Sequence, residues 1–125
     1  MIEKKIDPKI KELTQELIDK GTTYDLLFLD NVYHDELKFL RIDQKNNVQL
    51  LTKKDNMDFF TSLKNSGAVP LNNYVEFHYA DNDGENGFAI LTRKMKQIEE
   101  EQEFLFNIDW KKIKDNGKLY VKPFS

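Results

Sequence analysis

The sequence predicts an α+β protein with a mostly antiparallel sheet, made of a meander plus a hairpin, on which an N-terminal helix and one or two further helices pack. In the segment from Tyr74 to Thr92, two apolar runs flank a polar loop at 81–87, the pattern of a β-hairpin. Three short apolar runs between residues 24 and 53 predict the meander. Because strands and helices do not alternate regularly, α+β is favoured over a doubly wound sheet.

The first helix is predicted from Pro8 to Gly21. Asp7 supplies an N-cap side chain, and proline is well suited to the first helical position. Apolar residues then recur at helical spacing, at Ile10, Leu13, Leu17 and Ile18.

The meander is expected to contain strands at residues 24–30, 36–43 and 47–53, separated by polar clusters. The first of these is apolar on both faces, which is typical of a central strand. A second helix should follow, capped by Asp55 and ended by Gly67, with an inner stripe of Phe59, Phe60 and Leu63.

In the first strand of the hairpin, Val75, Phe77 and Tyr79 alternate with Glu76 and His78. Successive side chains of a strand point to opposite faces, so the three apolar residues predict the buried face.

The last third of the chain combines charged and apolar segments. We expect a charged helix over residues 93–103, a strand over 104–108, a short helical turn from Asp109 to Ile113 and a final strand over 118–122, reached through a turn at 116–117.

Composition restricts the class of protein. A chain of 125 residues can form one domain with one core, and we expect a single domain over residues 1–125. There is no apolar run long enough for a membrane span and there are no cysteines, so we expect a cytoplasmic protein without a membrane partner. Only Arg41 and Arg93 among the 19 basic residues are arginines, which counts against sequence-specific reading of nucleic acid.

No catalytic motif emerges. The loop at 81–87 has the composition of a calcium-binding loop, but with Gly84 in the sixth position the twelfth is Ile90 instead of glutamate. His34 and His78 each lie near carboxylates, although neighbours in sequence need not converge, and we expect a solvated turn and a surface pair. We therefore expect a protein without a metal or cofactor and without enzymatic activity, while an active site of carboxylates and lysines alone stays open.

Acidic residues in the hairpin loop and the charged segment predict a face that attracts a basic protein partner. They are Asp81, Asp83, Glu85, Glu99, Glu100, Glu101 and Glu103. The general profile, a small acidic α+β chain without catalytic motifs, is similar to that of toxin-immunity and phage anti-defence proteins. We expect a binding module that masks a partner by steric or electrostatic means. The alternatives are that these residues form only a solvated surface, or that an exposed edge strand pairs two copies in a homodimer.

The alternative function is binding of single-stranded nucleic acid. Residues 109–125 carry a net charge of +3, from five lysines and two aspartates, with aromatic residues between them. Such a surface can neutralise phosphates and stack on bases. Its residues would be Trp110, Lys111, Lys112, Lys114, Lys118 and Tyr120. The competing interpretation is that the apolar members of this segment face the core and the lysines face solvent.

Overall fold

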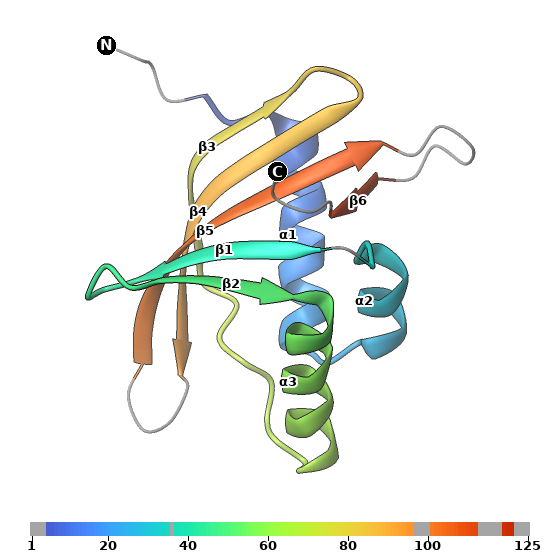
Figure 1. Ribbon diagram of the computed structural model, residues 1–125, viewed down its shortest axis with the longest axis vertical. Helices are drawn as coiled ribbons and strands as arrows, with labels where there is room; N and C mark the ends of the chain where they lie inside the picture. Colours follow the sequence, from blue (N-terminus) through green and yellow to red (C-terminus); the bar gives the residue numbers. More distant parts are fainter. Residues whose placement is uncertain (1–4, 36, 97–100, 113–118, 122–125) are drawn as a thin grey trace.

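The computed structural model describes residues 5–35, 37–96, 101–112 and 119–121. In this part of the chain, a bent antiparallel sheet is covered on one side by α1, while α2 and α3 lie near one end of it (Figure 1). The elements, in chain order, are α1 (Pro8–Thr22), α2 (Leu26–Val32), β1 (Lys38–Asp43), β2 (Val48–Thr52), α3 (Lys53–Asn65), β3 (Val75–Asn82), β4 (Asn86–Lys96), β5 (Glu101–Lys112) and β6 (Leu119–Val121).

The sheet confirms the predicted α+β class. Its strand order is β2-β1-β5-β4-β3, with β6 also paired to β5, and each strand pair is antiparallel. The longest pairing joins β4 to β5, in register from Asn86 opposite Lys111 to Lys96 opposite Glu101. The predicted strands at 36–43, 47–53 and 118–122 are confirmed as β1, β2 and β6, while the predicted turn at 116–117 lies outside the described residues.

Helix α1 forms as its sequence predicts. The Asp7 side chain accepts a hydrogen bond from the Ile10 amide at 2.9 Å, and Pro8 occupies the first turn. Ile10 and Leu17 are buried on the face that packs against the sheet. Local capping and a helical apolar period therefore agree with the tertiary packing.

The predicted strand at 24–30 is wrong, because residues 26–32 form helix α2. Asp25 caps this helix by accepting a hydrogen bond from the Phe28 amide at 3.1 Å, and Tyr24 turns the chain with a φ of 59°. Leu29 is fully buried. A short run that is apolar throughout suits either a buried strand or a buried helix, and here the cap selects the helix.

Helix α3 is the predicted second helix, but it begins earlier. Thr52 is the N-cap residue and Asp55 occupies the third helical position, so the two close a capping box. The helix ends before Gly67, whose φ of 72° suits glycine. Phe59 and Phe60 are half-buried, and no residue of α3 is fully buried.

The hairpin of β3 and β4 is confirmed, with one difference in its faces. A bulge between Phe77 and Tyr79 shifts the register, so Ala80 takes the next buried position. Tyr79, predicted on the buried face, instead stacks on Phe88 with ring centroids 5.6 Å apart.

The helix predicted over 93–103 is wrong where the structure describes it. Residues up to Lys96 extend β4 and residues from Glu101 begin β5, with Lys94 and Glu103 opposite one another and 4.0 Å apart. The helical turn predicted at Asp109 is also wrong as far as residue 112, since β5 continues, and Ile113 lies outside the described residues. Pairing with a neighbouring strand overrides the helical preference of these charged residues.

Two edges of the sheet are formed by β2 and β3. Residues 5–7 cover part of β3, because the Asp7 amide donates to the Ala80 carbonyl at 3.0 Å and the Ala80 amide donates to the Lys5 carbonyl at 2.8 Å. A homodimer by strand pairing stays a prediction. None of the three helices in the described residues has the length and apolar character that crossing a bilayer requires.

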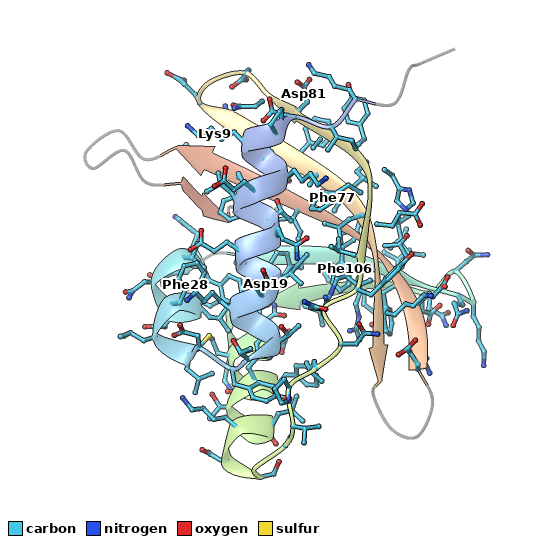
Figure 2. All side chains as sticks on the ribbon, turned by 180° about the vertical axis from the view of Figure 1, so that it is seen from behind. Lys9, Asp19, Phe28, Phe77, Asp81 and Phe106 are labelled. Carbon is cyan, nitrogen blue, oxygen red and sulfur yellow. The ribbon has the colours of Figure 1, made fainter. Side chains whose placement is uncertain are left out.

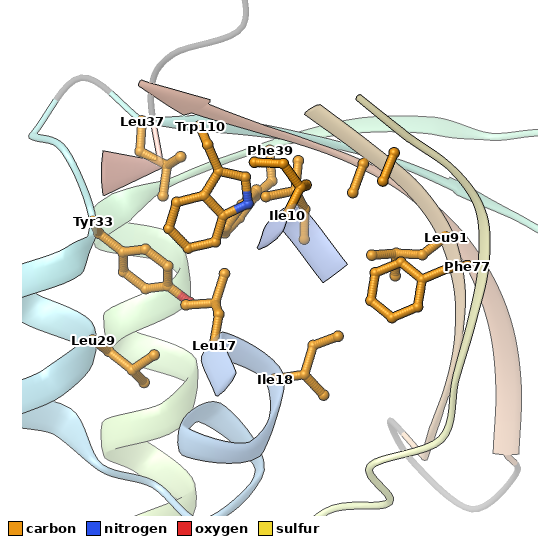
Figure 3. Close-up of a cluster of buried hydrophobic side chains, with 13 residues drawn as sticks. Ile10, Leu17, Ile18, Leu29, Tyr33, Leu37, Phe39, Phe77, Leu91 and Trp110 are labelled. Carbon is orange, nitrogen blue, oxygen red and sulfur yellow. The ribbon is translucent and has the colours of Figure 1, made fainter. Parts of the chain in front are cut away.

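Trp110 anchors the core between the sheet and α1. Its side chain is 1% exposed and lies beside Ile10 and Phe39 (Figure 3). The indole Nε1–H donates to the Thr14 hydroxyl at 3.0 Å, so the polar atom of the ring is satisfied within the core. The strand that carries the tryptophan is thereby fixed to α1.

Replacing Thr14 with valine keeps the shape but leaves the indole N–H without an acceptor. We expect Thr14→Val to lower the free energy of unfolding by about 1–3 kcal/mol, measured by urea denaturation. Thr23→Val is the control, because Thr23 is exposed and water can replace its hydrogen bond to the Asp19 carbonyl. Equal stability of Thr14→Val and the wild type would show that this hydrogen bond does not hold α1 to the sheet.

Candidate functional site

A cavity of about 180 Å³ lies between the inner face of the sheet and helices α1 and α3. Figure 2 shows Phe77 and Phe106 on the side of the sheet that α1 covers. Most of the cavity wall is apolar and comes from Leu17, Ile18, Phe39, Leu51, Leu91 and Phe106. Elements distant in sequence therefore enclose one space.

Strand alternation builds the sheet side of this cavity. On β1, β4 and β5, every second residue faces inward, which gives the pairs Phe39 and Arg41, Leu91 and Arg93, and Phe106 and Ile108. The register places Phe106 between Arg41 on one side and Leu91 on the other. Both arginines thus belong to the inner face.

Helix α3 forms the most accessible wall. Of its cavity-lining residues, Asp55 is exposed, whereas Asn56, Phe59 and Phe60 are half-buried. The opposite walls contain fully buried residues such as Leu91. Entry to the cavity is therefore easiest beside α3.

Arg93 is the most unusual residue of the cavity. Its side chain is 6% exposed, and Nη1 donates a long hydrogen bond to the Tyr74 carbonyl at 3.3 Å. Among the described residues, no carboxylate lies within 4.0 Å of the guanidinium. Burial lowers the pKa of Arg93 to about 10, and the charge of Asp19, together with that of Tyr33 at a pH high enough to ionise it, only partly opposes this effect.

Asp19 does not neutralise Arg93. It is exposed on α1 and accepts a hydrogen bond from the Gln15 side chain at 3.0 Å (Figure 2). The positive charge of Arg93 is therefore held in a largely apolar space without a paired anion in the described part of the chain.

Tyr33 supplies a polar group to the same cavity. It is 5% exposed and packs edge-on against Phe39, with ring centroids 5.5 Å apart (Figure 3). Its hydroxyl has no hydrogen-bond partner among the described residues. Burial raises the pKa of Tyr33, with an opposing contribution from Arg93, so the hydroxyl stays protonated at neutral pH and can donate a hydrogen bond.

Arg41 lies nearer the surface of the cavity. Its Nε donates to the Gln49 side chain at 2.6 Å, and its guanidinium lies over the Phe104 ring, 4.4 Å from the centroid. Burial lowers the pKa of Arg41, with an opposing effect from Asp43. Unlike Arg93, it is engaged by a polar side chain and an aromatic face.

Sequence reasoning did not find this site. Arg41 and Arg93 are the only arginines of the chain, and both line the cavity. Their rarity among 17 lysines is a signal in the sequence, but by itself it argues only against sequence-specific recognition of nucleic acid. Which residues they would meet depended on the pairing of β1, β5 and β4.

The predicted acidic residues are not brought into one patch. Asp81, Asp83 and Glu85 lie at the β3–β4 turn, whereas Glu101 and Glu103 lie at the far end of the β4–β5 pair. Ten residues of extended strand separate these ends, a distance of about 33 Å. Glu99 and Glu100 lie outside the described residues.

Several of these carboxylates already have local partners. Lys5 pairs with Asp81 at 2.6 Å, and Asp83 accepts hydrogen bonds from the Glu85 and Asn86 amides. Glu101 accepts from the Asn72 side chain at 3.1 Å. Recognition of a protein partner by either acidic group stays a prediction.

The proposed nucleic-acid face is interrupted by the core. Because Trp110 is 1% exposed, its ring is not available to stack on a base, and this part of the prediction is wrong. Lys111 is exposed. Lys112 and Tyr120 lie in β5 and β6, while Lys114 and Lys118 lie outside the described residues.

The two histidines lie apart from the cavity. His34 is in the connection between α2 and β1, and His78 Nε2 is 2.6 Å from the Thr92 hydroxyl on the neighbouring strand. Within the described ranges, no three side chains of histidine, aspartate or glutamate group closely enough to hold a metal ion.

In the described part of the chain, the antiparallel sheet and the helices packed against it form an α+β protein with the NTF2-like fold. An NTF2-like protein from Cytophaga hutchinsonii has a TM-score of 0.65 and 17% sequence identity, over 94% of this chain and 95% of that one. An NTF2-like protein of unknown function in nutrient uptake from Rhodospirillum rubrum has a TM-score of 0.64 and 15% identity, over 91% and 93%.

The similarity to these structures concerns the fold. No protein-family model matches the sequence, and neither does any curated protein.

The buried charge of Arg93 is expected to lower the stability of the folded state. The pKa of Arg93 is lowered from 12.5 to about 10. This shift corresponds to a penalty of about 3 kcal/mol for keeping the guanidinium charged in the folded state instead of the unfolded state. The penalty is fully present below pH 10 and disappears as the pH rises toward 12.5. We expect Arg93→Met to raise the free energy of unfolding at pH 7 by about 1–3 kcal/mol, because the new side chain is apolar.

Urea denaturation at pH 7 measures this effect. Lys94→Met is the matched control, since Lys94 is the next residue, on the other face of β4, where it pairs with Glu103 near solvent. We expect a loss of about 0.2–1 kcal/mol there. Destabilisation by Arg93→Met would mean that the arginine has a structural role instead.

Proposed function

We propose that the protein binds a small organic molecule in the cavity between α1, α3 and the sheet. The observation that carries this proposal is the cavity itself, a largely apolar space of about 180 Å³ with a few polar residues in its lining. Ligand sites are commonly concave and mostly apolar, with a small number of polar groups that orient the ligand.

The size of the cavity limits the ligand. An apolar protein cavity of about 150 Å³ admits benzene. The slightly larger space here suits one aromatic ring with a small substituent, or a chain of about six to eight carbons. Larger fused rings would require α3 to move.

The residues of the cavity favour binding over catalysis. A general base must be free to accept a proton, and no histidine lines this space. The carboxylate among the described residues of the cavity lining belongs to Asp55. The Asp55 side chain closes the capping box of α3, and hydrogen bonds from Thr52 lower the pKa of this carboxyl group. An ionised, engaged carboxylate is a weak base.

The proposal is tested by filling the cavity. Leu51 lines the cavity, while its neighbour Leu50 is 56% exposed on the other face of β2. We expect Leu51→Trp to weaken binding of benzoate and benzyl alcohol at least tenfold, because the indole occupies their space. Leu50→Trp should bind as the wild type does.

Binding is measured by titration with each compound, followed in ¹H–¹⁵N correlation spectra. Saturable shifts at Leu91 and Phe106 that are lost in Leu51→Trp support a site in this cavity. If neither compound, nor hexanoate, produces saturable shifts in the wild type, the proposal is wrong.

We also propose that a protein partner, as the sequence predicts, binds at one end of β5. Strand alternation places Glu101 and Glu103 on the outer face, both exposed, next to Leu105, which is 38% exposed. Two carboxylates beside an exposed leucine suit a partner with a basic and apolar surface. Masking of such a partner, as in inhibitors, immunity proteins and anti-defence proteins, is the corresponding function.

Charge reversal tests this second proposal. We expect the double variant Glu101→Lys, Glu103→Lys to lose a stoichiometric partner that the immobilised wild type retains from host lysate treated with nuclease. Glu85→Lys, at the opposite end of the sheet, serves as the control. Equal retention by both variants would exclude the β5 end from the interface.

A further inference from the structure

We propose that the cavity selects small organic monocarboxylates, with the Arg93 guanidinium as counter-ion and the Tyr33 hydroxyl as a second hydrogen-bond donor. This inference rests on the proposed function of the same cavity and specifies the class of ligand. It follows from the lack of an anionic partner for Arg93 among the described residues.

Arg93 has most of its hydrogen-bonding capacity unused. A guanidinium carries five N–H donors, and one of them reaches the Tyr74 carbonyl, at 3.3 Å. The residue is 6% exposed, so the remaining donors lie largely away from the protein surface. Buried arginines are normally paired, and an anion brought into the cavity would supply the missing partner.

The remaining polar groups favour a carboxylate. A guanidinium presents two parallel N–H groups that match the two oxygens of a carboxylate. Tyr33 lines the same cavity, and its hydroxyl, which has no hydrogen-bond partner among the described residues, stays protonated, so it can donate to a carboxylate oxygen as well.

The charge of the ligand is limited to one. Among the described residues that line the cavity, Arg93 is the one deeply buried cation, whereas Arg41 is half-buried and engaged with Gln49 and Phe104. Asp55 adds a negative charge at the accessible wall near α3. A dianion would bring a second charge into an apolar space without a buried cation to balance it.

The body of the ligand is apolar. Leu17, Ile18, Leu91 and Phe106 surround the space beside Arg93 and Tyr33. With a volume near 180 Å³, the cavity accommodates benzoate, phenylacetate or hexanoate, each of which joins one carboxylate to a small apolar group.

The test compares each acid with its amide, which has nearly the same shape but no charge. Dissociation constants of benzoate and benzamide, and of hexanoate and hexanamide, are measured by titration calorimetry with wild type and variants. In the wild type we expect the acids to bind at least tenfold tighter than the amides, as charge-assisted hydrogen bonds to a buried donor should give. Phthalate, a dianion of similar size, should bind more weakly than benzoate.

Variants assign the preference to named groups. In Arg93→Met we expect the acid and its amide to have about equal dissociation constants. Arg93→Lys should keep part of the preference for the acid, because the charge remains although the planar guanidinium is lost. Tyr33→Phe should reduce this preference by a smaller factor. Lys94→Met, which removes a neighbouring charge on the other face of β4, should leave it unchanged.

A stability measurement separates recognition from a structural role. The melting temperature of ligand-free Arg93→Met should equal or exceed that of the wild type, while benzoate should raise the melting temperature of the wild type only. A variant that melts lower and still prefers benzoate would overturn the inference.

Different results would contradict carboxylate selection and ligand binding in the cavity. Equal affinity for acids and amides, with binding still lost in Leu51→Trp, would overturn carboxylate selection and leave a cavity for neutral ligands. Absence of binding by acids and amides alike would overturn both.

Discussion

The pairing of β4 with β5 is the constraint on which the rest of the structure depends. These are the two longest strands, and their register runs without a break from Asn86 opposite Lys111 to Lys96 opposite Glu101. Because strand side chains alternate, this register decides at once that Leu91, Arg93, Phe106 and Trp110 face inward. A slip of one of these strands by one residue would turn its own inward pair, Leu91 and Arg93 or Phe106 and Trp110, to the outer face. Helix α1 can cover the sheet only in the register that presents this apolar set, and Trp110 then fixes it through Thr14.

The cavity results from incomplete coverage of that inner face. Helix α1 packs tightly, with Ile10, Thr14 and Leu17 buried, whereas α3 contributes half-buried aromatic rings and no fully buried residue. The space between them contains a charged group that the fold does not neutralise within the described residues. An interior arrangement of this kind stabilises the folded state less than an apolar one would. Such local losses of stability are typical of sites that have a function, and here the same residue offers the strongest recognition group of the cavity.

Much of the fold could be predicted where the signal is local. Asp7 and Pro8 mark the start of α1, and the alternating run from Val75 marks β3. Two of the wrong predictions concern segments in which local preference is ambiguous. Leu26–Leu29 is apolar throughout and fits a helix or a strand, and the charged residues around Lys94 favour a helix until β5 pairs with them. Tyr79 changed faces because a bulge, which alternation does not reveal, precedes it.

By itself, the sequence determined the fold class, the N-cap of α1, the hairpin and the unusual scarcity of arginine, since all of these depend on composition or on neighbours along the chain. Only the tertiary structure decided that Trp110 belongs to the core, that the acidic residues lie at opposite ends of the sheet, and that Arg93 and Tyr33 share a cavity. The physical reason is that these relations join segments separated by tens of residues. They are fixed by strand register and by the burial of the combined apolar face, which no single segment contains.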